Sequence, residues 1–139
     1  RDLHLSIRRQ RQMCKETDYK VYRESVSGGS NYVINADIDD LYDQFAYGNA
    51  KNPIAIKNFC KFLSDSLPSP PKYLLLIGKS IKNSQVKNNS TNWINCKIPT
   101  MGNPSSDNLF TTGIRGSNSI TPFIPVAKLR IDNIPVEEC

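Results

Sequence analysis

The sequence has only one histidine, His4, among its 139 residues. A cysteine or serine nucleophile usually needs a histidine as its base, so this scarcity argues against both mechanisms. His4 stands beside the start of the chain, where ends are often poorly ordered, and we expect it on a frayed surface. The sequence therefore assigns no catalytic residue.

Cysteine pairs with the spacing of metal ligands are also absent. The four cysteines are Cys14, Cys60, Cys96 and Cys139, and no two of them form a CxxC pair, which disfavours a zinc site. We expect Cys14 and Cys60 on apolar helix faces and Cys96 within a strand, each as a small buried hydrophobic residue. No metal ligand is predicted among them.

Glycine-rich loops that could hold a phosphate are missing as well. Gly78-Lys79-Ser80 resembles the end of a phosphate-binding loop, but that loop needs a further glycine where this sequence has Tyr73. Four aspartates fall within residues 37–43, and helix capping with a solvated face explains them better than a metal site, which would need more oxygen ligands. We therefore predict no cofactor.

No apolar run approaches the ~20 residues of a membrane span. The net charge of +5 arises partly from Arg8-Arg9-Gln10-Arg11, which has no aromatic residue around it. A nucleic-acid surface would interleave basic and aromatic side chains, so we predict neither a nucleic-acid partner nor a membrane span. The chain begins at Arg1 without a methionine, and we expect a fragment of a longer protein, with any targeting segment outside it.

The most informative stretch that is present is the apolar run Tyr73-Leu74-Leu75-Leu76-Ile77, which stops at Gly78. It predicts a strand over 72–77 that is buried on both faces, as in parallel sheets flanked by helices. Before it, cap signals and apolar stripes predict two helices, one from Asp37 to Gly48 and one from Asn52 to Leu67.

Weaker patterns predict the remaining elements: a helix over 4–17, strands over 19–26, 32–34, 94–98 and 123–131, a polar loop over 79–92, a short extended piece over 109–112 and a helix that begins within 132–139. Alternating strands and helices indicate an α/β fold. We expect a single domain over 1–139, built as a three-layer sandwich with a mainly parallel, flavodoxin-like sheet.

Two blocks of the sequence resemble gingipain-type cysteine peptidases. The first runs from Asp40-Leu41-Tyr42-Asp43-Gln44-Phe45-Ala46-Tyr47-Gly48 to Asn52-Pro53-Ile54-Ala55-Ile56-Lys57-Asn58-Phe59, and the second is Tyr73-Leu74-Leu75-Leu76-Ile77-Gly78. Pro99-Thr100 and Ser106-Asp107 resemble later motifs of the family, and Leu129-Arg130 matches a further one in part. The likeness covers about residues 5–135 and is closest to the branch that contains the sortase of the type IX secretion system.

The chain also departs from this family. Lys79 stands where the family usually has an acid, and Leu129 stands where it usually has glycine. These departures bear on whether the parent protein is an active peptidase.

The resemblance implies the non-catalytic amino-terminal subdomain of a secreted peptidase, because the family's catalytic histidine and cysteine lie downstream of every matched motif. The implied partners are a caspase-like catalytic subdomain of the same polypeptide and protein substrates. The implied location is extracytoplasmic, secreted or at the cell surface. Two alternatives stay open, a degenerate peptidase-like binding module of a cell-surface protein and a free-standing nucleotide-binding protein.

Overall fold

The computed structural model describes residues 3–8, 13–117 and 120–130. Its centre is an all-parallel sheet with the strand order β2-β1-β3-β4. The strands are β1 (Leu3–Arg8), β2 (Tyr32–Asp37), β3 (Tyr73–Ile77) and β4 (Val126–Leu129).

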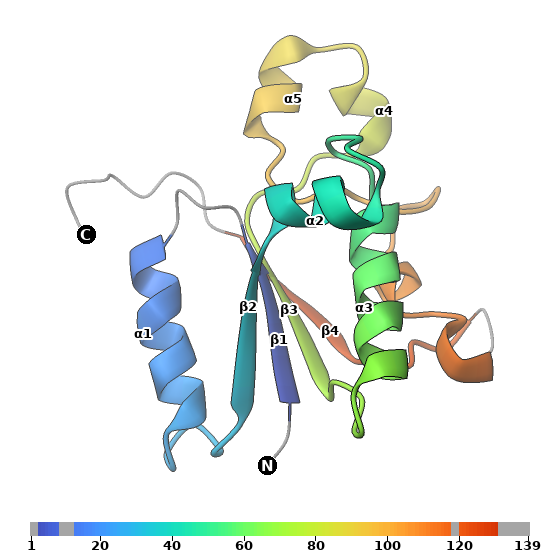
Figure 1. Cartoon of the computed structure of the whole chain (residues 1–139). Coiled ribbons are helices and arrows are strands. Elements are labelled where there is room, and N and C mark those ends of the chain that lie inside the picture. Colours follow the sequence, from blue (N-terminus) through green and yellow to red (C-terminus); the bar gives the residue numbers. More distant parts are fainter. Residues whose placement is uncertain (1–2, 9–12, 118–119, 131–139) are drawn as a thin grey trace.

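Helices cover the sheet from two sides (Figure 1). Helix α1 (Met13–Glu24) lies on one face, and α2 (Ile38–Phe45) and α3 (Ile54–Ser66) lie on the other. The link from β3 to β4 holds α4 (Asn83–Val86), α5 (Ser90–Asn95) and the 3-10 turns η2 (Asp107–Phe110) and η3 (Ile114–Gly116). The predicted three-layer α/β sandwich with a flavodoxin-like strand order is confirmed.

The first strand occupies part of the segment that was predicted as a helix over 4–17. Leu5 and Ile7 are fully buried on one face, while His4 and Ser6 point to the other. The alternation has a period of two, and β1 can pair on both edges, with β2 and with β3. These two hydrogen-bonded ladders outweigh the weak helical stripe, so that prediction is wrong for residues 4–8.

Three further predictions are wrong in type. Residues 19–26 were predicted as a strand but form the second half of α1 and the turn after it. The strand predicted over 94–98 is the end of α5 and an irregular segment. The extended piece predicted over 109–112 is the end of the turn η2 and the two residues after it. The helix predicted to begin within 132–139 lies outside the described residues.

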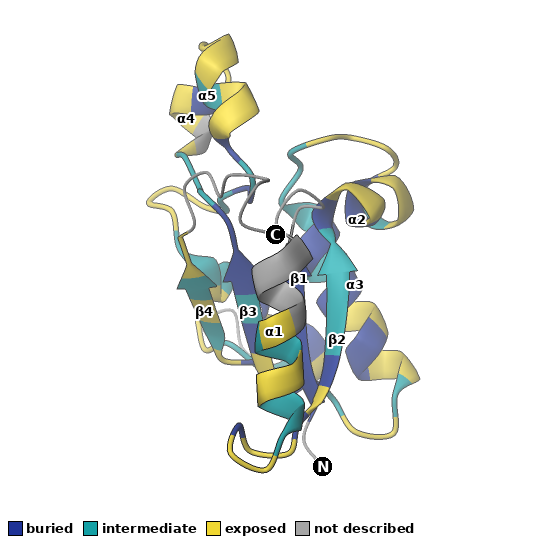
Figure 2. Ribbon diagram, turned by 90° about the vertical axis from the view of Figure 1, so that its left-hand side faces the viewer, coloured by how far each residue is buried: buried dark blue, intermediate teal, exposed yellow. Residues whose placement is uncertain are grey.

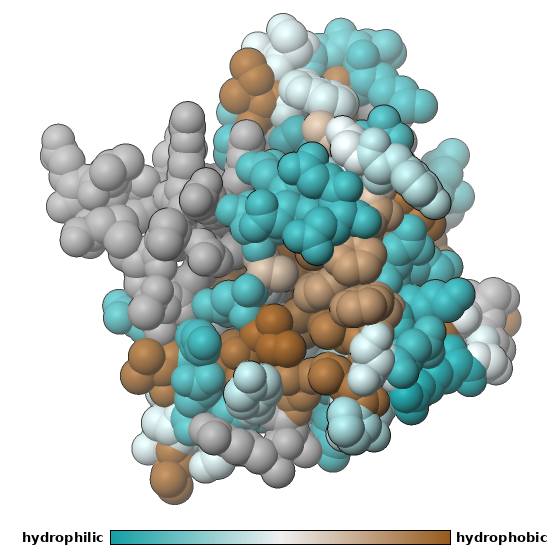
Figure 3. Space-filling view, in the orientation of Figure 1, coloured by the Kyte–Doolittle hydropathy of each residue, from teal (hydrophilic) through white to brown (hydrophobic). Residues whose placement is uncertain are grey.

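The helices α2 and α3 and the strand β3 lie where the sequence predicts them. The Asp37 side chain accepts a hydrogen bond from the Asp39 backbone N–H at 3.0 Å, which is the predicted cap of α2. The exposed acids of α2 give the hydrophilic surface seen over this helix, above an apolar area between α1 and α3 (Figure 3).

The main core lies between the sheet and the pair α2 and α3. Its fully buried members include Leu5, Ile7, Leu76 and Ile56, and the Phe45 and Phe59 rings meet within it, the Phe45 ring partly buried. About 25 cal/mol of stabilisation accompanies each Å² of apolar surface that such packing removes from water. This side of the sheet therefore fixes the frame on which the loops are built.

The opposite face of the sheet is covered unevenly by the described residues. Helix α1 lies over β1 and β2, where the Tyr19 ring stands 5.9 Å from the His4 ring. Strands β3 and β4 lie to one side of α1, and this helix does not cover them (Figure 2). Tyr73 is 43% exposed and Leu129 48%, with exposed Ala127 and half-buried Leu75 between them. We call these four residues the open sheet face. The prediction that β3 is buried on both faces is therefore wrong for this face.

Candidate functional site

Polar loops gather at the carboxyl edge of the sheet, where α/β proteins with parallel strands usually bind their ligands. Strand β3 ends at Ile77, and the chain changes direction at Gly78. The φ angle of Gly78 is 144°, which glycine adopts readily and other residues rarely do. The Gly78 N–H donates to the Leu129 carbonyl at 2.9 Å, which ties this turn to the end of β4. Beyond it, α4 and α5 form a projection above the sheet (Figure 1).

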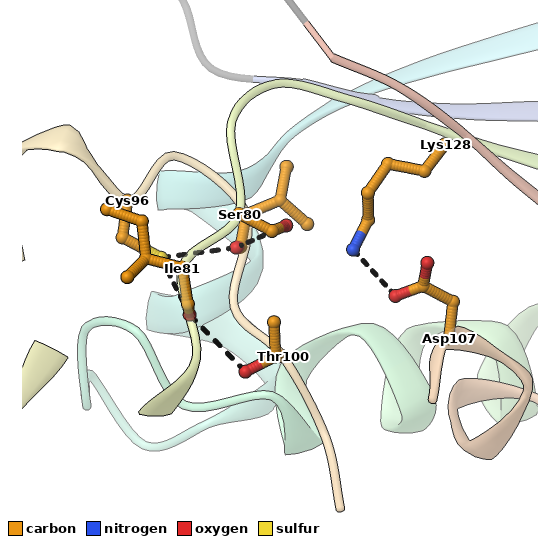
Figure 4. Close-up of polar contacts among 7 residues, drawn as sticks. Ser80, Ile81, Cys96, Thr100, Asp107 and Lys128 are labelled. Carbon is orange, nitrogen blue, oxygen red and sulfur yellow. Dashed lines mark hydrogen bonds and ion pairs between the residues drawn. The ribbon is translucent and has the colours of Figure 1, made fainter. Parts of the chain in front are cut away.

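Hydrogen bonds fasten the two stems of this projection to each other (Figure 4). The Lys79 carbonyl accepts from the Ile98 N–H at 3.1 Å, and the Ser80 hydroxyl donates to the Ile98 carbonyl at 2.9 Å. The Thr100 hydroxyl donates to the Ile81 carbonyl at 3.4 Å. These contacts cross-link segments that lie almost twenty residues apart, so the base of the projection is well defined.

Cys96 belongs to the base of the projection and not to a strand. The residue is 2% exposed, and its thiol donates to the Ile98 carbonyl at 3.3 Å. The Lys51 ammonium donates to the Cys96 carbonyl and lies 5.9 Å from the centre of the Trp93 ring. The predicted burial of Cys96 is confirmed, while its predicted strand is wrong.

A cavity of about 710 Å³ opens beside the projection. One wall is formed by Lys82, Ser84, Lys87 and Asn88, and the other is the turn 102–105. We call it the basic cavity, because its lining, among the residues that the structure describes, holds two lysines and no carboxylate. No sequence motif predicted this cavity, because its walls come from separate segments that the fold brings together.

Asp107 stands next to the second wall in the chain, in the turn η2. Its Oδ1 lies 2.6 Å from the Lys128 Nζ of β4 (Figure 4). Asp107 belongs to the Ser106-Asp107 pair that resembles a family motif. Its carboxylate forms an ion pair with Lys128 of this chain.

His4 does not lie on a frayed surface, which corrects the prediction. It is 4% exposed within β1, and neither ring nitrogen has a hydrogen-bond partner among the described residues. Burial lowers the pKa of His4 below its ordinary 6.5, and the nearby positive charge of Arg23 lowers it further. A central strand holds the side chain in place because its backbone is paired on both edges.

Cys60 is fully buried on α3, as predicted, and burial raises the pKa of its thiol to about 12. Such a thiol is protonated at neutral pH and is a poor nucleophile. Cys14 lies in α1, and Cys139 is outside the described residues.

Two other kinds of feature can be judged for the described ranges alone. Within 3–8, 13–117 and 120–130, no three histidine, cysteine or acidic side chains come together as a metal site. No helix of that part is long and apolar enough to cross a membrane.

The fold and site define an α/β domain with an open basic cavity at the carboxyl edge of its sheet. The model of peptidase family C25, the gingipain family, matches residues 14–133, and the chain belongs to this family. The resemblance to gingipain-type peptidases is therefore confirmed at the level of the family. No curated protein matches the chain, and no solved structure does.

Proposed function

We propose that this chain is a non-catalytic structural subdomain of a secreted gingipain-like cysteine peptidase. The catalytic histidine and cysteine would lie outside it, in a caspase-like subdomain of the same polypeptide. The parent protein would cleave protein substrates by thiolate attack on a peptide carbonyl. The sequence blocks around Asp40–Phe59 support the finer assignment to the type IX sortase branch, and with it an extracytoplasmic, secreted or cell-surface location.

The observation that carries this proposal is the separation of the candidate base from the candidate nucleophiles. His4 faces α1 across one side of the sheet, whereas Cys60 packs in the core on the other side. A nucleophile and its base need a distance of about 3 Å, and a β-strand lies between these two groups.

Cys96 is also remote from His4, along the strands rather than across them. His4 is in register with Tyr73 at the start of β3, while Cys96 is anchored beside Lys79 beyond the end of β3. A strand advances roughly 3.3 Å per residue, so the length of β3 alone separates the two by roughly 13 Å. Neither Cys60 nor Cys96 therefore forms a preorganised catalytic pair with His4.

The open sheet face supports a structural role. Parallel sheets are normally covered on both faces, and Tyr73 and Leu129 leave apolar surface uncovered by the described residues. Polypeptide that continues from β4 starts at the border of this face, because Leu129 is both its last member and the last residue of that strand. We propose that the catalytic subdomain packs there.

Hydrolysis of arginyl, lysyl and broad peptide substrates under reducing conditions tests the proposal. The chain should give no turnover, and a His4→Ala variant should be indistinguishable from it. Turnover that is lost in His4→Ala would overturn the proposal and place a catalytic base in β1. Turnover that His4→Ala retains, but that alkylation of the thiols abolishes, would overturn it as well.

The alternative of a degenerate peptidase-like binding module in a cell-surface protein is favoured by the basic cavity. A cavity of about 710 Å³ falls within the size range of ligand sites. The polypeptide downstream of this chain separates the two functions, since a histidine and a later cysteine, each after an apolar strand, are expected only for the peptidase.

A further inference from the structure

One stretch of the chain carries lysines without any acid to balance them. Between Asp65 and Asp107 the sequence has five lysines and no acidic residue. The whole chain has 18 basic and 13 acidic residues, so these five lysines equal its net charge of +5 and the remainder is balanced. Lys82 and Lys87 of this stretch line the basic cavity. A concave surface lined by one sign of charge focuses the field and attracts ligands of the opposite sign.

The charge of these two lysines is not compensated locally. Neither Lys82 nor Lys87 forms a hydrogen bond or an ion pair through its side chain with any residue that the structure describes. Asp107 is the acid closest in sequence to the cavity lining, and its carboxylate contacts Lys128. Both ammonium groups are therefore available to a ligand.

The first wall of the cavity is a fixed turn. The Lys82 carbonyl accepts hydrogen bonds from the backbone N–H groups of Gln85 and Val86, at 2.9 and 3.1 Å. The Val86 side chain is 5% exposed and lines a small hollow with Ile81 and Cys96 at the base of the projection. The backbone that carries both lysines is thereby held in place.

The second wall is equally constrained. Gly102 has a φ of 89°, and a Cβ atom at this position would lie 2.3 Å from Cδ1 of Leu109. The Ser106 N–H donates to the Met101 carbonyl at 2.9 Å and closes the turn. Binding to two preformed walls loses little conformational entropy, which favours a specific ligand over diffuse attraction to a charged surface.

We propose that the basic cavity binds an acidic segment of a polypeptide, with its carboxylates at Lys82 and Lys87. Ser84, Asn88 and Ser105 offer hydroxyl and amide groups that can donate to and accept from a peptide backbone. Membership of a peptidase family makes a polypeptide the natural ligand, so the choice of polymer rests on the proposed function. The charge of the ligand rests on the cavity alone.

The test uses the fluorescence of Trp93, the only tryptophan of the chain, which lies in α5 on the same projection. The whole chain is titrated at low ionic strength with a capped glutamate-serine peptide, and with a lysine-serine peptide of the same length. We expect a saturable response to the acidic peptide alone, weakened by added salt. Amide shifts in the NMR spectrum should map it to residues 82–88 and 102–105. No response by either method, or shifts elsewhere, would overturn the proposal.

Two double variants that remove the same charge test whether the peptide binds in the cavity or is attracted by the net charge of the whole chain. Lys82→Gln combined with Lys87→Gln should weaken binding about fivefold to tenfold, as expected for two partly exposed ion pairs. Lys57→Gln combined with Lys61→Gln removes the same charge from α3 and should leave binding unchanged. Equal weakening in both double variants would overturn the proposal, provided that both melt like the parent chain.

Inorganic phosphate distinguishes a peptide site from a general anion site. Phosphate at the peptide's concentration should neither reproduce the Trp93 response nor displace the peptide, and either result would overturn the proposal. These measurements do not involve turnover. A failure to bind the peptide would overturn the binding proposal and leave the proposed non-catalytic function unaffected. Turnover in the peptidase assay would overturn that function and leave the evidence for the basic cavity unaffected.

Discussion

The Nζ atom of Lys128 lies 2.6 Å from Oδ1 of Asp107 and joins the last strand of the sheet to the turn η2. Their side chains are 20% and 35% exposed, so water screens the attraction only in part. The pair spans a link of twenty-one positions, and it fixes the turn next to the second wall of the basic cavity.

A double-mutant cycle with Lys128→Met and Asp107→Asn should measure this contact. We expect a coupling free energy of about 0.5 to 1 kcal/mol at low salt, decreasing as salt is added. Urea unfolding of the four proteins provides the measurement. Strictly additive effects of the two substitutions would show that the pair does not stabilise the fold.

Shortening a side chain should lower the free energy of unfolding by different amounts on the two faces of β3. Leu76 is fully buried in the core, and Leu76→Ala should cost about 2 to 5 kcal/mol through lost transfer energy and a cavity. Leu75 is half-buried on the open sheet face, so Leu75→Ala should cost about half as much. Equal costs in denaturant unfolding would mean that the open sheet face is covered in solution.

His4 should make stability depend on pH. Its pKa in the folded chain is below the ordinary value of 6.5, so the unfolded chain takes up a proton first as the pH falls. This contribution to stability is complete above about pH 6.5, declines below it, and levels off beneath the folded pKa. Unfolding measured across this window should show the decline, and His4→Phe, which keeps an aromatic ring beside Tyr19, should reduce it. An unchanged profile in that variant would assign the decline to other groups.

The thiol of Cys60 should be inert in the folded chain. It is fully buried and its pKa is raised to about 12, so neither access nor the thiolate is available to an alkylating reagent. Peptide mapping after treatment with a maleimide should find Cys60 unmodified under native conditions and modified in concentrated guanidinium. Rapid native labelling would indicate that α3 separates readily from the sheet.

The parts of the fold that could be predicted have redundant local signals. In α2, the apolar stripe agrees with the cap at Asp37, and in β3 the apolar run is bounded by prolines and Gly78. In β1, the residues fit both a period of two and a loose helical stripe, and only the distant partners β2 and β3 decide between them. Their identity is not contained in the local sequence.

For α5 the missed signal was local. The Asn89 side chain accepts hydrogen bonds from the N–H groups of Thr91 and Asn92, which makes it an N-cap, while Trp93 and Ile94 favour a strand by composition. The candidate site was harder to predict because it depends on two turns meeting. Lys82 and Gly102 belong to no motif, and their proximity follows from contacts such as that between Thr100 and Ile81.

The position of β1 has a consequence for where the domain can be cut. The span that matches the peptidase family begins at residue 14, after β1 has ended. Strands β2 and β3 each pair with β1 and not with each other, so an expression boundary drawn at that residue would remove the strand that joins them. During synthesis, β1 leaves the ribosome before β2 and β3, the two neighbours that later assemble against it. Trimming the amino terminus would therefore divide the sheet in two instead of shortening it.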